Sequence, residues 1–249
     1  MADMRPNLVK DKLAAAECVT VMMEMNDPDL IDQLGDAPFD GVWLEAEHGR
    51  VDISEISNLT RACDLWGKTS IVRVNSHDYG LIYRTLDRGA QGIVVPHVNN
   101  RAEAEAIVRA AKFAPAGMRG MFTSRQGIGV KNYLEIANDH TLVIILIEDI
   151  EAIRNLDEIL EVDEIDVFFV APGDLAQSMG HIGDPGHPDV QEVIESAIRE
   201  IAAAGHVPGM VATEASVSQL QEWGARFFTT SMDPWVRAGI ARFTGLIKS

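Results

Sequence analysis

Short apolar runs alternate with longer amphipathic segments along the whole chain. Most of these runs are rich in Val, Ile and Phe, and their residues do not alternate between apolar and polar. Strands that are buried on both faces of a parallel sheet have this pattern. The pattern predicts eight strands, at residues 18–23, 41–44, 70–74, 92–95, 142–147, 166–170, 207–211 and 226–230.

The segments between these runs carry signals for helix starts. Asp27 and Asp233 each precede a proline, which suits the cap and the first position of a helix. Asp52 and Glu55 have the spacing of a capping box. The clearest helix covers residues 191–204, where apolar residues recur on one face at helical spacing.

Strands that alternate with about as many helices predict a (β/α)8 TIM barrel, formed as one domain by residues 1–249. A helix over residues 6–15 would cover the floor of the barrel. The chain length is close to the ~250 residues typical of this fold. An open doubly wound sheet is the alternative, and it is disfavoured because no GxGxxG motif follows the first strand.

The composition argues against some classes of binding partner. A formal net charge of −17 argues against nucleic acid and against an anionic membrane surface. No run approaches the ~18 apolar residues that a membrane span requires. Two cysteines without metal-site spacing, and the lack of a signal peptide, predict a protein of the reducing cytoplasm.

Polar residues gather where several of the predicted strands end. In an α/β barrel the catalytic residues lie at the carboxyl ends of the strands, so these side chains are expected to form one site. Two acids and a histidine follow the second strand, an arginine ends the third, and an acid follows both the fifth and the sixth. The residues are Glu45, Glu47, His48, Arg73, Glu148 and Asp174.

Glu148 and Asp174 follow neighbouring strands, so their carboxylates are expected to converge. Two such charges repel each other unless one is protonated or a cation lies between them. A hard divalent ion such as Mg²⁺ or Mn²⁺ takes carboxylate and water oxygens as ligands. The alternatives are that Glu148 stabilises the first turn of a helix and that Asp174 is a helix N-cap.

His48 and Arg73 are the other candidates for chemistry. A carboxylate beside His48 would orient its imidazole as a general base, although a histidine that only lines a turn has the same sequence context. Arg73 ends an apolar run and needs a buried anionic partner, either a substrate carboxylate or a neighbouring acid. The backbone N–H groups of Gly173 and Asp174, at a predicted helix start, suit a further anion contact.

Several motifs together resemble the HpcH/HpaI aldolases, which are divalent-metal-dependent (class II) pyruvate aldolases. They occur in the family's order over residues 19–230, and the resemblance points to enzymes of the 4-hydroxy-2-oxoheptanedioate or 2-dehydro-3-deoxyglucarate aldolase type. The motifs are Glu47-His48-Gly49, Arg73, the segments 89–96, 116–120, 147–148 and 171–175, and Gly180-His181.

The resemblance implies a barrel of the phosphoenolpyruvate/pyruvate-binding type, assembled as a hexamer (a trimer of dimers) with the last helix exchanged between subunits. It implies a divalent metal, Mg²⁺, Mn²⁺ or Co²⁺, held by Glu148 and Asp174. Arg73 would bind the keto oxygen of the substrate, and His48, oriented by Glu45, would act as the base. The remaining implied residues are Ala171, Pro172, Gly173 and Asp174 for substrate binding, Glu47 and Arg119 as supports, and Asp87 near the subunit interface.

The implied reaction is the reversible retro-aldol cleavage of a 4-hydroxy-2-oxo acid to pyruvate, or a close 2-oxo acid, and an aldehyde. Oxaloacetate decarboxylation is an expected side activity, and aromatic or sugar-acid catabolism is the implied setting. No lysine stands at a predicted strand end, so a Schiff-base mechanism is not expected. An acyl-CoA lyase of the citrate-lyase-β or malyl-CoA type and a non-catalytic barrel are the alternatives.

Departures from the family pattern leave the substrate open. Glu45 stands where the family more often has Asp, and Leu146 where it often has Gln. The segment Ala171-Pro172-Gly173-Asp174 replaces the family's usual Gly-Pro-Ala/Ser/Thr-Asp. Two long connections, at residues 114–132 and 179–188, are expected to face the aldehyde end of the substrate.

Overall fold

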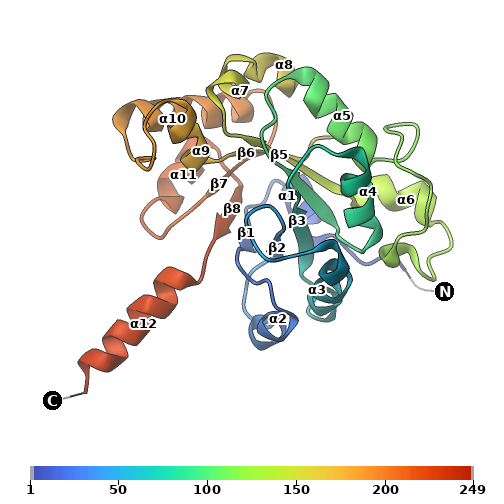
Figure 1. Cartoon of the computed structure of the whole chain (residues 1–249), viewed down its shortest axis with the longest axis horizontal. Helices are drawn as coiled ribbons and strands as arrows, with labels where there is room; N and C mark the ends of the chain where they lie inside the picture. Colours follow the sequence, from blue (N-terminus) through green and yellow to red (C-terminus); the bar gives the residue numbers. More distant parts are fainter. Residues whose placement is uncertain (1–2, 248–249) are drawn as a thin grey trace.

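The computed structural model describes residues 3–247 and contains eight parallel strands closed into a barrel (Figure 1). Each strand pairs with the next one in the chain, and β1 also pairs with β8, which closes the ring. The strands are β1 (Val19–Met22), β2 (Gly41–Glu45), β3 (Thr69–Arg73), β4 (Gly92–Val95), β5 (Leu142–Ile147), β6 (Val167–Val170), β7 (Pro208–Val211) and β8 (Phe227–Thr230).

The strands agree with the apolar runs of the sequence to within one residue at either end. The (β/α)8 fold is therefore confirmed. The open doubly wound alternative is wrong, because the pairing of β1 with β8 leaves no open sheet edge. Residues 1–2 and 248–249, the ends of the predicted domain, lie outside the described residues.

Helices connect the strands, and most of them cover the outside of the barrel. They are α1 (Leu8–Ala14), α2 (Pro28–Leu34), α3 (Ile53–Leu65), α4 (Tyr79–Asp87), α5 (Arg101–Ala111), the 3-10 turn η1 (Arg125–Gly127), α6 (Tyr133–His140), α7 (Ile150–Arg154), α8 (Leu156–Leu160), α9 (Pro172–Ser178), α10 (Pro188–Ala203), α11 (Val217–Trp223) and α12 (Asp233–Gly245). Asp27 caps α2, and Asp52 with Glu55 forms the full capping box of α3, as predicted. Helix α10 begins three residues earlier than predicted, because His187 caps it and Pro188 takes its first position.

Helix α1 closes the amino-terminal end of the barrel, where a helix over residues 6–15 was predicted. The Asn7 side chain caps this helix and donates to the backbone carbonyls of Gln91, at 3.1 Å, and His140, at 2.9 Å. Gln91 directly precedes β4, and His140 lies two residues before β5. These bonds tie α1 to the floor of the barrel, opposite the strand ends that carry the candidate site.

The core has two layers, one inside the barrel and one between the barrel and the helices. Trp43 lies inside, with its ring centroid 5.4 Å from that of Phe169. Side chains alternate along a strand, so Glu45 points to the same side as Trp43, and Arg73 to the same side as Ile71. The apolar interior of the barrel therefore ends in polar groups at its carboxyl-terminal mouth.

Helix α12 extends away from the barrel (Figure 1, red). None of the described residues in this helix is buried, although Trp235, Ile240 and Phe243 are large and apolar. Among residues 3–247, no helix is both long enough and apolar enough to cross a membrane.

Candidate active site

Strand pairing sets Arg73 against two carboxylates at the barrel mouth. Arg73 lies opposite Glu45 in the register of β2 and β3. Its Nε and Nη2 atoms lie 2.8 and 2.7 Å from Glu45 Oε2, and its Nη1 atom lies 3.1 Å from Glu47 Oε2. All three side chains are at least 85% buried. Of the two partners that the sequence left open for Arg73, the structure provides the neighbouring acids.

Glu45 also fixes the turn that follows β2. Its Oε2 atom accepts a bond from Trp43 Nε1 at 3.1 Å, and its Oε1 atom accepts from the backbone N–H groups of Glu47 and His48. A Cβ atom at Gly49 would lie 2.5 Å from the Glu45 carbonyl oxygen, so only glycine fits there. Burial raises the pKa of Glu45, but the bond to Arg73 and its charge outweigh this and lower the pKa below its ordinary value.

The imidazole of His48 lies on the exposed side of this turn. Its Nε2 atom is 3.7 Å from Glu47 Oε2, whereas Glu45 contacts only the backbone N–H of His48. The predicted contact between Glu45 and the His48 imidazole is therefore absent from the structure. The physical reason is that Glu45 points into the barrel beside Trp43, while the turn carries His48 outward. Glu47 is the carboxylate next to the imidazole.

A second polar group lies at the ends of β4 and β5. The backbone N–H of His97 donates to Glu148 Oε1 at 2.7 Å. The Nδ1 atom of the His97 ring lies 3.3 Å from Glu148 Oε1 and 3.2 Å from Asp149 Oδ2. His97 adopts the left-handed backbone region, with φ of 53°, which turns both its N–H and its ring toward these acids.

Glu148 is a buried carboxyl group, and two other acids, Asp174 and Glu47, lie near enough for their charges to act on it. Burial raises its pKa to about 7, and the charges of Asp174 and Glu47 add to the rise, although the N–H and the ring of His97 oppose it. Burial lowers the pKa of His97, but the charge of Glu148 and the bond to Asp149 outweigh this and raise it above the ordinary value. A divalent cation would relieve the repulsion between Glu148 and Asp174, and the donors offer the oxygen ligands that a hard ion prefers. These residues fit a metal such as Mg²⁺ or Mn²⁺.

The two non-metal alternatives for these acids are wrong. Helix α9 is capped at Ala171 and begins at Pro172, so Asp174 lies within its first turn and is not an N-cap. Glu148 precedes helix α7, which is capped at Asp149, and its carboxylate accepts from His97 instead of from the helix.

The segment from Ala171 to Asp174 lies where β6 passes into α9. Gly173 is exposed, and a Cβ atom built there would meet nothing within 4 Å. The backbone at this point is therefore open to a bound molecule from the solvent side. The first turn of a helix has free N–H groups, which suit an anionic or carbonyl oxygen.

Asp87 and Arg119 pair with each other, away from this mouth. Arg119 Nη2 lies 2.6 Å from Asp87 Oδ1, and the Arg119 side chain is almost fully buried. The later part of the connection at residues 114–132 lies near the barrel floor, where Arg125 Nη1 is 2.7 Å from Asp64 Oδ2 and Gln126 donates to the carbonyl of Gly89. The earlier part reaches the start of α4, where Tyr79 donates to the backbone carbonyl of Met118. That this loop faces the aldehyde end of the substrate stays a prediction.

The sequence model described as HpcH/HpaI aldolase/citrate lyase matches residues 19–235, which is most of the chain. The chain belongs to the HpcH/HpaI aldolase/citrate lyase family. It is 32% identical over 237 residues to the hydroxypyruvate/pyruvate aldolase of Pseudomonas aeruginosa, which covers 93% of this chain and 88% of that protein. It is 37% identical over 221 residues to a 4-hydroxy-2-oxo-heptane-1,7-dioate aldolase of Klebsiella pneumoniae, which covers 85% of this chain and 83% of that protein.

A solved structure of an HpcH/HpaI aldolase/citrate lyase family protein from Burkholderia cenocepacia has the same fold. The two structures agree with a TM-score of 0.91 at 27% identity, over 98% of this chain and 100% of that one. These relatives confirm the family and the aldolase activity that the motifs predicted. The chain is a carbon–carbon lyase on a TIM barrel.

The structure adds His97 to the HpcH/HpaI site that was expected from the sequence. His97 stands directly after Pro96 at the end of β4, so its position at a strand end was visible in the sequence. Its contact with Glu148 was not visible, because that contact depends on the pairing of β4 with β5 and on the left-handed backbone at His97.

Proposed function

We propose that this enzyme catalyses the reversible retro-aldol cleavage of a 4-hydroxy-2-oxo acid to pyruvate, or a close 2-oxo acid, and an aldehyde. The observation that carries the proposal is the meeting of Arg73, Glu148 and Asp174 at one end of the barrel. The names of the relatives from Pseudomonas and Klebsiella support this substrate class.

Glu148 and Asp174 would hold the divalent ion, and Mg²⁺, Mn²⁺ and Co²⁺ are the candidates. The ion supplies Lewis-acid polarisation of the substrate keto group. The buried carboxylate of Glu148, whose pKa the nearby charge of Asp174 helps to raise, supports this assignment.

Arg73 would orient the 2-oxo acid and stabilise the negative charge that develops when the carbon–carbon bond breaks. Three of the five guanidinium N–H groups point to Glu45 and Glu47. Two N–H groups are left for a substrate oxygen. Because the two acids hold the guanidinium in place, those donors need little reorganisation when substrate binds.

His48 would remove the proton from the C4 hydroxyl group, after which the C3–C4 bond breaks. Its exposed position at the rim suits contact with the part of the substrate that leaves as the aldehyde. Glu47, 3.7 Å away, would hold the imidazole in place. The free N–H groups of Gly173 and Asp174 would contact the substrate carboxylate.

Pyruvate release tests this proposal. The metal-stripped enzyme is expected to release no pyruvate from a panel of 4-hydroxy-2-oxo acids, and added Mg²⁺, Mn²⁺ or Co²⁺ should restore the release. Borohydride should trap no adduct with pyruvate. Full activity after metal removal, a trapped adduct or turnover that requires coenzyme A would each contradict the proposal.

His48→Asn tests the role of the base. This change should slow aldol cleavage by about 100-fold or more, which is the usual contribution of a general base. Oxaloacetate decarboxylation requires no hydroxyl base and should persist in the variant. Equal loss of both activities would assign His48 to substrate or metal binding instead.

We propose further that the enzyme is a hexamer, a trimer of dimers, in which α12 is exchanged between neighbours. An open apolar pocket of about 530 Å³ lies at the base of α12, and it is lined largely by Met22, Met25, Leu34, Phe39 and Trp235. Among residues 3–247, nothing covers the exposed apolar side chains farther along α12, and a neighbouring barrel would do so. Cys18 and Cys63 are free thiols, which supports a cytoplasmic location.

A further inference from the structure

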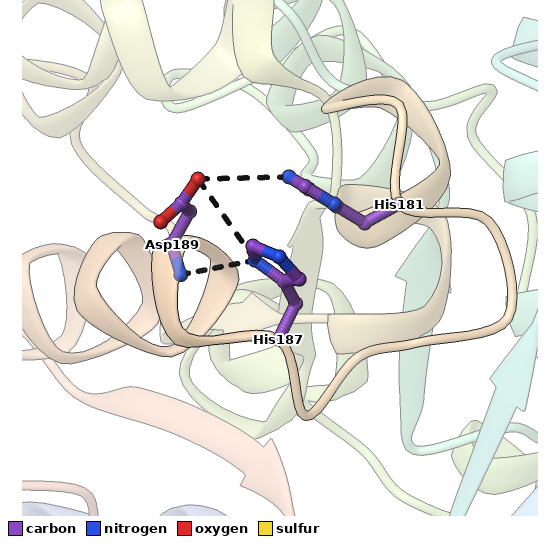
Figure 2. Close-up of side chains that lie close together, drawn as sticks. All are labelled: His181, His187 and Asp189. Carbon is purple, nitrogen blue, oxygen red and sulfur yellow. Dashed lines mark hydrogen bonds and ion pairs between the residues drawn. The ribbon is translucent and has the colours of Figure 1, made fainter.

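The connection between α9 and α10 gathers two histidines and an acid that the proposed aldolase reaction does not use. His181 and His187 lie in this connection, and Asp189 lies in the first turn of α10 (Figure 2). Each residue offers one ligand atom, and these atoms lie within 4.8 Å of one another. His181 Nε2 and His187 Nδ1 lie 3.8 and 3.9 Å from the same oxygen, Asp189 Oδ2.

The loop backbone holds this group together. Gly180 and Gly183 have φ values of 88° and 78°, which fold the chain back on itself on either side of His181. The His181 and His187 rings stack, with their centroids 3.7 Å apart and their planes at 18°. Both rings are partly exposed, so an ion from solution can reach them.

The donor set differs in kind from the carboxylates at the barrel mouth. Imidazole nitrogen suits Zn²⁺, Cu²⁺, Co²⁺ and Ni²⁺, whereas carboxylate oxygen alone suits Mg²⁺ and Mn²⁺. Two imidazoles and one carboxylate form a known zinc ligand set, with water in the fourth position.

Binding requires one local rearrangement. Two imidazoles that lie nearly parallel cannot both direct an in-plane lone pair at one ion, so one ring has to turn. His187 Nδ1 now accepts a bond from the backbone N–H of Asp189 at 3.2 Å, and an ion bound at that nitrogen would replace this bond. The exposure of His187 permits the rotation, and the site is formed on binding rather than held rigid beforehand.

We propose that His181, His187 and Asp189 bind one Zn²⁺ ion, which links the loop after α9 to the first turn of α10. The loop follows the helix that carries Asp174, so the ion steadies the segment behind the barrel mouth. It takes no part in the aldol chemistry, because its ligands lie outside the set formed by Arg73, Glu148 and Asp174.

A zinc titration of the metal-stripped full-length enzyme tests the site. The titration is carried out in excess Mg²⁺, which occupies the carboxylate site at the barrel mouth, and the variants assign the Zn²⁺ that Mg²⁺ does not displace. The wild type is expected to bind one Zn²⁺ that Mg²⁺ does not displace. His181→Gln, His187→Asn and Asp189→Asn should each weaken this binding by at least ~10-fold, since loss of even a supporting contact costs that much in metal sites.

The variants separate metal binding from folding. The His187→Asn variant keeps a side-chain acceptor that can cap α10, so the start of the helix is preserved while the imidazole is lost. His140→Gln, at the end of α6, is the matched control and should leave the zinc affinity unchanged. Zn²⁺ should also protect the bonds between residues 179 and 187 from proteolysis in the wild type and not in His187→Asn. Unchanged Zn²⁺ binding in the double variant of His181 and His187, or no Mg²⁺-resistant Zn²⁺ in the wild type, would overturn the proposal.

Discussion

The buried carboxyl group of Glu148 should destabilise the metal-free enzyme at neutral and alkaline pH. Its pKa is about 7 in the fold, against an ordinary value of 4.5. The folded state therefore binds the Glu148 proton more tightly than the unfolded state does. The bound proton therefore stabilises the folded state. This stabilisation is fully present below pH 4.5, decreases as the pH rises toward 7, and is lost above pH 7.

The size of this effect follows from the two pKa values. A difference between 4.5 and about 7 corresponds to ~3 kcal/mol at pH 8, at 1.36 kcal/mol for each pH unit. Glu148→Gln removes the ionisation and keeps an oxygen to accept the bond from the His97 N–H. For a chain of this size each kcal/mol shifts the Tm by roughly 2–4 °C. The variant should melt about 6–12 °C above the wild type at pH 8, in the absence of metal.

The assay is thermal unfolding of the metal-stripped wild type and variant at pH 5 and pH 8, at one protein concentration and one scan rate. The difference in Tm should be small at pH 5 and large at pH 8. Adding Mn²⁺ at pH 8 should stabilise the wild type and not the variant, because only the wild type keeps the carboxylate ligand. Glu192→Gln, at an exposed position on α10, is the control for a change of charge alone. A Tm difference that stays constant with pH, or that grows toward acid, would refute the reasoning.

Two further outcomes are expected. Arg73→Gln should lower stability by about 3 kcal/mol, because it leaves the carboxylates of Glu45 and Glu47 buried without their cation; Arg73→Lys should cost less stability yet still slow pyruvate release, since an ammonium lacks the planar fork. An equal Tm for Arg73→Gln and Arg73→Lys would contradict the conclusion that the ion pairs of Arg73 with Glu45 and Glu47 stabilise the fold. Removal of residues 233–249 should yield a smaller assembly by light scattering, with the far-UV signal of the barrel retained, and an unchanged particle mass would rule out exchange of α12.

The barrel was predictable because its strands are buried on both faces. The run from Leu142 to Ile147 contains only Leu, Ile and Val. A six-residue run of this composition between two helices is typical of a strand buried on both faces, and it is too short for a buried helix. The helix bounds were less predictable. Helix α10 starts before its first strongly periodic residue, because capping by His187 and the fixed φ of Pro188 determine the start rather than the apolar face.

The positions of the site residues also followed from the sequence, since strand ends meet at one face of a barrel. Which of these side chains contact each other could not be predicted from the sequence. Glu45 and Glu47 stand close together in the sequence, and only the structure shows that Glu45 turns inward to Arg73 while Glu47 lies between Arg73 and His48. That distinction depends on the turn at Gly49, where the carbonyl of Glu45 leaves no room for a side chain.

Charge at the barrel mouth connects these observations. Arg73 is matched by Glu45 and Glu47, so its positive charge is already compensated before any substrate arrives. Glu148 and Asp174 then leave the mouth with excess negative charge, in a chain whose formal net charge is −17. A 2-oxo acid is an anion and would be repelled from such a surface. In the proposed mechanism, a divalent cation at Glu148 and Asp174 would offset this negative charge, so metal binding is expected to favour substrate binding as well as catalysis. The carboxylates that destabilise the metal-free fold are therefore expected to make the metal bind before the substrate.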